Sequence, residues 1–161
     1  MGEDKKVINV VVAGLGGQGV LKGSDILAEA AFQAGLDVKK AEVHGMSQRG
    51  GSVTSDVRFG GSPASPMVPA GEADFLMVLS PDQVDNNRHC LRKGGVLIAP
   101  DAIDLEALPN KRSLNVALLG VLSGHLDIPE QAFLAAVRAN LPARLHEVNE
   151  QAFALGRRAG D

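Results

Sequence analysis

The stretch VINVVVAGLGGQG, residues 7–19, decides the fold, because a buried strand in it runs directly into a glycine-rich turn. The apolar run at 7–13 is continuous rather than alternating, which is typical of a strand covered on both faces of a parallel sheet. Residues 20–34 follow with apolar side chains at helical spacing, and Gly35 is a suitable helix end. Strand, tight turn and helix in this order indicate an α/β layer fold.

The rest of the chain repeats this alternation. A helix is predicted to begin at Pro81, with Ser80 as its N-cap, and to end at Lys93-Gly94-Gly95. A loop rich in Pro, Gly and Ser covers 60–71. Further strands are predicted at 37–43, 52–59, 75–79 and 96–99, and closing helices at 115–124, 129–140 and 147–158. The prediction is a single three-layer Rossmann-like α/β domain over 1–161, with a mixed, mostly parallel sheet of about five strands and closing C-terminal helices.

Composition excludes several classes of function. The net charge is −3, and the aromatic residues are five Phe with no Tyr or Trp, which argues against nucleic-acid binding. The one cysteine, Cys90, allows no disulfide within the chain, no four-cysteine zinc site and no iron–sulfur cluster held by this chain alone. No apolar run approaches the roughly 20 residues of a membrane span. We therefore expect a soluble, cytoplasmic protein with no metal site, nucleic acid or membrane partner.

The turn after the first strand matches G-x-G-x-x-G and contains the first set of candidate binding residues. They are Gly14, Gly16, Gly17, Gln18 and Gly19. Glycine permits a tight turn and lets backbone N–H groups at a helix N-terminus approach an anion. In dinucleotide-binding proteins an acidic residue roughly 20 positions further on contacts a ribose, and Glu42 is the candidate here. The alternative is that these glycines only allow close packing of helix and strand.

A second glycine-rich loop, HGMSQRGG at 44–51, follows the next strand and argues against a simple dinucleotide site. Loops at the carboxyl ends of neighbouring strands share one crevice, so the two loops are expected to face each other. The second set of candidate binding residues is Ser47, Gln48, Arg49, Gly50 and Gly51. Together the loops predict a cradle for an anion or phosphate, or an interface that meets another subunit's cofactor.

Two residues of this loop are candidates for a catalytic role. Arg49 could form a bidentate contact with a phosphate, or it could pair with Glu42 or Asp56 and only hold the loop. His44 could donate to a carboxylate or carry a proton, or it could make a packing hydrogen bond. The residues alone leave these alternatives open.

The run GLGGQGVLKGSDILAEAAFQAGLDVKKAEVHGMSQRGGSVTSDVRFG, residues 14–60, resembles the gamma-type domain of 2-oxoacid:ferredoxin oxidoreductases. The form EVHGMSQRGGSV is similar to the branch of that family that acts on indolepyruvate. Further similar stretches are SPMVPAGEADFLMVLSPDQ at 65–83 and SLNVALLGVLSGHLDIPEQAF at 113–133. The resemblance therefore extends over nearly the whole chain.

The resemblance implies a subunit rather than a self-sufficient enzyme. The family's reaction is the oxidative decarboxylation of a 2-oxoacid with coenzyme A, which yields an acyl-CoA, carbon dioxide and reduced ferredoxin. Thiamine diphosphate, Mg2+ and iron–sulfur clusters are expected on a larger partner chain, through which ferredoxin would be reduced. This chain is expected to bind none of these cofactors alone and to shape the substrate or coenzyme A side of the site. The runner-up interpretation is a stand-alone dinucleotide-binding domain, and a third is a purely structural subunit.

Overall fold

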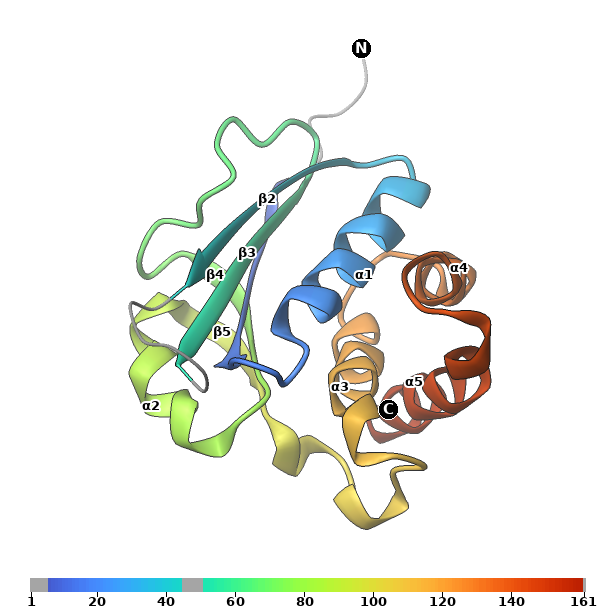
Figure 1. The fold of residues 1–161 in the computed structure, drawn as a ribbon. Coiled ribbons are helices and arrows are strands. Elements are labelled where there is room, and N and C mark those ends of the chain that lie inside the picture. The colour runs from blue at the N-terminus through green and yellow to red at the C-terminus, as the bar shows by residue number, and fades with distance from the viewer. Residues whose placement is uncertain (1–5, 45–50, 161) are drawn as a thin grey trace.

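The computed structural model describes residues 6–44 and 51–160, which contain a five-stranded sheet in the order β2-β3-β1-β4-β5 (Figure 1). The strands are β1 (Ile8–Leu15), β2 (Asp37–His44), β3 (Ser52–Gly60), β4 (Ala73–Val78) and β5 (Leu91–Ile98). β1 pairs in parallel with β4, and β4 with β5, whereas β3 is antiparallel to both β1 and β2. Four strands thus run in one direction and only β3 is reversed, which confirms the mixed, mostly parallel sheet.

The long helices gather on one face of the sheet (Figure 1). They are α1 (Val20–Gln33), α3 (Leu114–Ser123), α4 (Glu130–Asn140) and α5 (His146–Ala159). α1 and α3 contact strands, while α4 packs on α1 and α5 packs on α3 as a second tier. The other face carries a thinner cover, in which Val68 of the loop after β3 and Val84 of α2 (Val84–Asn87) pack on a small apolar cluster. The predicted α/β fold with closing C-terminal helices is confirmed, with layers of unequal thickness.

The predicted helix from Pro81 to the Lys93-Gly94-Gly95 stop is wrong. The segment consists of three short turns, η1 (Pro81–Gln83), α2 and η2 (Arg88–Cys90), and β5 begins at Leu91. Gly94 has a φ of +79°, and a Cβ at Gly95 would lie 2.6 Å from Leu91 Cδ1, so the two glycines bend a strand rather than end a helix. The Ser80 hydroxyl donates to the Asp82 carboxylate and caps no backbone N–H group.

α3 and α5 cross with their backbones in contact. A Cβ added at Gly156 would overlap the carbonyl oxygen of Ala117, and one added at Gly120 would overlap that of Phe153. Every residue of α3 from Asn115 to Ser123 is buried, as expected for a helix that is covered on all sides. The two glycines therefore set the distance between the inner and outer helical tiers.

Ser55 Oγ on β3 provides a test of this core. The side chain is fully buried, and its hydroxyl has no hydrogen-bond partner among the described residues. An unsatisfied buried hydroxyl costs about 1–3 kcal/mol of stability. Its removal recovers that cost but leaves a small void, which offsets part of the gain. We expect Ser55→Ala to raise Tm in calorimetry by about 2–4 °C, the equivalent of about 1 kcal/mol in a domain of this size.

Ser123 is the matched control for this prediction, because it is 2% exposed and its hydroxyl donates to Gly120 O and accepts from Arg157. Ser123→Ala should lower Tm. An equal fall in Tm for both variants would show that the Ser55 hydroxyl has a partner in solution.

Candidate functional site

The glycine-rich turn between β1 and α1 is built by backbone conformations that favour glycine. Gly17 and Gly19 have φ values of +87° and +86°, in the left-handed region. Gly14 is required for a different reason, since a Cβ there would lie 2.8 Å from Gln18 Oε1 and 2.9 Å from Val20 Cγ2. The turn brings the first N–H groups of α1 to the carboxyl edge of the sheet, where they can face an anion.

Two side-chain amides hold this turn in shape. The Leu15 N–H donates to Gln18 Oε1 at 2.7 Å, so the carboxamide oxygen of Gln18 closes the turn. Asn115 is 6% exposed, and its Nδ2 donates to Gly19 O at 3.1 Å, which ties the start of α3 to the start of α1. Sequence reasoning missed this contact, because Asn115 lies 96 positions from Gly19 and a helix cap is the simpler interpretation of its position.

The second glycine-rich loop connects β2 to β3 at the same edge. Ser47, Gln48, Arg49 and Gly50 lie outside the described residues, and of His44 only the backbone is described, paired with Val53. Gly51 is described, and its carbonyl accepts the Gly16 N–H at 2.9 Å. The expected approach of the two loops is therefore met at Gly16 and Gly51.

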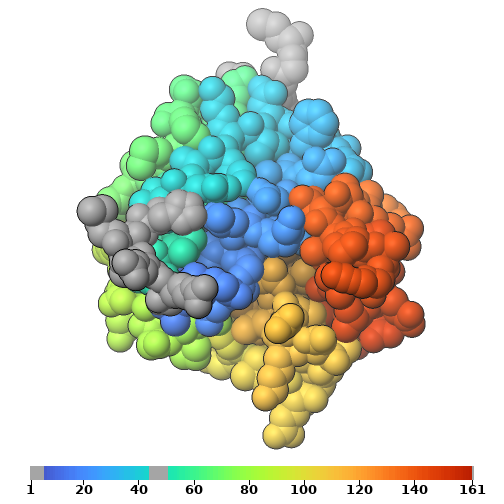
Figure 2. Space-filling view, viewed as in Figure 1, coloured from blue at the N-terminus to red at the C-terminus, as the bar shows by residue number. Residues whose placement is uncertain are grey.

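Two hollows, each of about 450 Å³, open beside the turn (Figure 2). The first is lined by Gly17, Gln18, Leu79 and the start of α3, and the second by Gly19, Asn115 and the connection between α4 and α5. Both include Gly19 and Arg112. We call the two hollows together the basic groove, because four cationic residues line them: Lys22, Lys111, Arg112 and Arg144. No Asp or Glu is among the described residues that line either hollow.

Short 3-10 turns place three of these cations. In η5 (Lys111–Ser113), the Asn110 side chain accepts the Arg112 N–H at 2.9 Å and fixes the turn in front of α3. Arg144 lies in η6 (Ala143–Leu145), which follows Pro142 and precedes α5. Since helix N-termini and exposed cations both favour negative charge, the groove is suited to a ligand with several phosphates. No sequence pattern predicts that residues 111, 112 and 144 approach residue 19.

Glu42 does not have the geometry of a ribose-binding acid. β3 lies between β1 and β2, so Glu42 is separated from the glycine-rich turn by a complete strand. Its Oε1 is 2.6 Å from Lys40 Nζ, and Lys40 also contacts Asp25. Asp56, the other carboxylate considered as a partner for Arg49, accepts the Val68 N–H at 2.9 Å, and burial raises the pKa of its carboxyl group.

Cys90 and the side chains that could ligate a metal are the remaining reactive groups of the described residues. Burial raises the pKa of the Cys90 thiol, which is unfavourable for a nucleophile. No group of three or more His, Cys, Asp or Glu in residues 6–44 and 51–160 could hold a metal ion. None of the helices in those ranges is long and apolar enough to cross a membrane.

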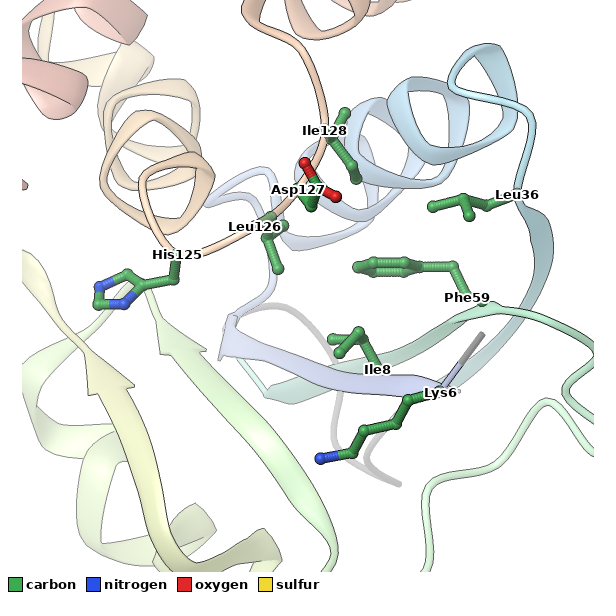
Figure 3. A pocket seen from close by; sticks show the side chains of 9 residues that line it. Lys6, Ile8, Leu36, Phe59, His125, Leu126, Asp127 and Ile128 are labelled. Carbon is green, nitrogen blue, oxygen red and sulfur yellow. The ribbon is translucent and has the colours of Figure 1, made fainter. Parts of the chain in front are cut away.

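A further hollow of about 390 Å³ lies at the opposite end of the sheet (Figure 3). Ile8, Leu36, Phe59, Leu126 and Ile128 form apolar walls, and Lys6, His125 and Asp127 contribute polar groups. These residues come from the start of β1, the end of β3, the α1–β2 turn and the α3–α4 connection. This hollow lacks the glycine-rich backbone and the concentration of cations found at the carboxyl edge.

Comparison with known proteins finds relatives in sequence and in fold. A family model described as pyruvate ferredoxin/flavodoxin oxidoreductase matches residues 9–109. The chain is 33% identical to the indolepyruvate oxidoreductase subunit IorB of Thermococcus kodakarensis over 194 aligned residues, which cover 96% of this chain and 96% of the relative.

Two solved structures share the fold. One is a 2-oxoglutarate:ferredoxin oxidoreductase from Magnetococcus marinus with 2-oxoglutarate, coenzyme A and succinyl-CoA bound, with a TM-score of 0.83 at 19% identity over 97% of this chain and 31% of that chain. The other is the gamma subunit of a keto/oxoacid ferredoxin oxidoreductase from Geobacter sulfurreducens, with a TM-score of 0.80 at 24% identity over 95% of this chain and 98% of that chain.

Proposed function

Because the chain belongs to the pyruvate ferredoxin/flavodoxin oxidoreductase family, we propose that it is the small subunit of a 2-oxoacid:ferredoxin oxidoreductase. The substrate class that we propose is an aryl-pyruvate such as indolepyruvate, which the full-length similarity to an IorB subunit supports. The assembled enzyme would convert the 2-oxoacid and coenzyme A to an acyl-CoA and carbon dioxide and pass two electrons to ferredoxin.

Within that enzyme, the role proposed for this chain is to bind coenzyme A. The observation that carries this proposal is the basic groove at the N-terminus of α1. Coenzyme A bears a 3′-phosphate and a diphosphate, and several cations beside exposed helix N–H groups suit these charges. Besides the cations of the basic groove, the proposed contacts are the backbone of Gly14, Gly16, Gly17 and Gly19, the side chain of Gln18 and, from the second loop, Ser47, Gln48, Arg49, Gly50 and Gly51.

The chemistry of the reaction is proposed to lie on a larger partner subunit. Thiamine diphosphate, Mg2+ and iron–sulfur clusters would be held there, and ferredoxin would be reduced there, because one cysteine in this chain cannot ligate a cluster. His44 and Arg49 stay candidates for contact with the reacting groups of substrate or coenzyme A. A cytoplasmic location likewise stays a prediction.

The dinucleotide-binding alternative is less well supported. An acid that contacts a ribose belongs on the strand next to the glycine-rich turn, and here Glu42 is one strand further away and paired with Lys40. Calorimetric titration of the purified chain with coenzyme A and with NADH separates the two functions. We expect coenzyme A to bind with an affinity that falls as salt rises, and NADH not to bind. If NADH bound and coenzyme A did not, the proposal would be overturned.

Arg49 gives a prediction for the assembled complex. As a bidentate phosphate contact it is worth about 1.5–3 kcal/mol, so Arg49→Ala should raise the KM for coenzyme A roughly ten- to a hundredfold. Arg49→Lys should raise the KM for coenzyme A similarly, since the lysine ammonium group is a point charge and cannot form the bidentate contact of a guanidinium. The measurement is steady-state kinetics with coenzyme A and the 2-oxoacid varied separately. Wild-type kinetics for both variants in a complex that still assembles would remove Arg49 from the site.

A further inference from the structure

A side-chain hydrogen bond crosses the carboxyl end of β1. Ser52, the first residue of β3, donates its hydroxyl to Oε1 of Gln83 in η1 at 2.8 Å. Gln83 is only 8% exposed. Its backbone carbonyl accepts a hydrogen bond from Nδ2 of the buried Asn87 at 2.8 Å. The Gln83 side of the bond is therefore held firmly by its surroundings.

The bond joins β3 to the turn that follows β4, and these two strands do not pair with each other. In the sheet order, β3 and β4 flank β1 on opposite sides, and η1 follows β4 after two residues. Neighbouring strands are about 4.8 Å apart, so β3 and β4 are too far apart for backbone hydrogen bonds. The two side chains bridge this gap at the point where β1 leaves the sheet.

The glycine-rich turn is directly linked to this bridge. Ser52 is paired with Leu15 in the β1–β3 register, and the preceding residue, Gly51, accepts the Gly16 N–H at 2.9 Å. Leu79, which lines the first hollow of the basic groove, stands between β4 and η1 on the other side. A shift of Ser52 relative to Gln83 would move Gly51, and with it Gly16, relative to that wall.

We propose that Ser52 and Gln83 are positioning residues, which hold the glycine-rich turn in the conformation that binds the phosphates of coenzyme A. This inference rests on the function proposed above. Neither side chain needs to touch the ligand, because the pair acts through Gly51 and Gly16. A loop whose donors are held in place in advance binds more tightly than one that must be ordered on binding.

The test uses the full chain with Ser52→Ala, Gln83→Met, the two combined, and Ser52→Thr, which keeps the hydroxyl. Coenzyme A affinity is measured by calorimetry, and hydrogen exchange of the Gly16 amide is followed without ligand. We expect each single variant to raise Kd about five- to tenfold and to speed exchange at Gly16. The double variant should lose no more affinity than either single variant, since both substitutions break the same hydrogen bond. Ser52→Thr should keep wild-type affinity and wild-type exchange at Gly16. Ser62→Ala, which removes an exposed hydroxyl from the loop after β3, is the control.

Unchanged exchange at Gly16 in both single variants would overturn the positioning role, as would additive losses of affinity in the double variant. Faster exchange at Gly16 with unchanged coenzyme A affinity would overturn the link to binding. If the wild-type chain binds no coenzyme A, the proposed function fails, and Gly16 exchange still decides whether the pair positions the turn. The two failures are therefore distinguishable.

Discussion

Gly156→Ala should destabilise the protein by at least about 3 kcal/mol, a large share of the roughly 5–15 kcal/mol that separates the folded and unfolded states of an ordinary domain. The added Cβ would overlap the Ala117 carbonyl oxygen and lie 2.8 Å from its carbonyl carbon and 3.0 Å from the Val121 nitrogen. All three atoms belong to the backbone of α3, so no side-chain rotation relieves the overlap, and the two helices must separate. Urea unfolding monitored by circular dichroism measures the change.

The control is Gly124→Ala at the end of α3. Gly124 has a φ of −66°, and a Cβ there would lie 3.4 Å from Val121 O, an ordinary contact. Alanine at a compatible position stabilises by about 0.4–1 kcal/mol through the unfolded chain. Similar, small effects of the two substitutions would show that α3 and α5 do not meet through their backbones.

Removal of two arginines from the basic groove should have the largest effect on binding. Arg112→Ala combined with Arg144→Ala is expected to weaken coenzyme A binding about a hundredfold at low salt, since each loses a charge-assisted contact of at least about 1.5 kcal/mol. Both side chains are exposed, so melting temperatures should change little and the loss of affinity should shrink as salt rises. Isothermal titration at two salt concentrations provides the measurement.

Arg88→Ala is the matched substitution outside the groove. Arg88 is exposed and paired with Asp85, in the short turns that precede β5. It carries the same charge but does not line either hollow, so its removal should leave affinity within about twofold. If Arg88→Ala, which removes one charge, lost about half as much binding free energy as the double variant, which removes two, coenzyme A would be responding to net charge rather than to this groove.

The parts of the molecule that could be predicted from the sequence are those with local signals. The Ile and Val residues at 8–12, the glycines at 14–19 and the stop at Gly35 follow one another within one short stretch of the chain, and β1, the turn and α1 formed as predicted. The prediction of a helix after Pro81 was wrong because a pair of glycines, here Gly94 and Gly95, is found both where helices end and where strands bend. Strand order was out of reach, since nothing local to β3 shows that it inserts between β1 and β2.

The candidate site divides in the same way. The glycine-rich turn could be predicted from the sequence, because glycines at this fixed spacing have few structural explanations. Arg112 and Arg144 could not be singled out, because an exposed arginine in a turn is common, and only the packing of α3 and α5 brings them to α1. Asn115 stands at the start of a predicted helix, where a cap explains it, and its contact with the distant Gly19 could not be predicted.

The reversed direction of β3 has a consequence for how this family can diversify. In a sheet of parallel strands, each loop at the carboxyl edge leads into a helix, so a change in its length shifts a packed layer. The connection at residues 45–50 instead joins two adjacent antiparallel strands, β2 and β3, which end and begin at the carboxyl edge of β1. Insertions and exchanges there leave α1 and the core unaltered. Selection, or a protein engineer, can therefore vary this segment, and with it the ligand contacts proposed for Ser47, Gln48 and Arg49, while the glycine-rich turn beside it stays constant.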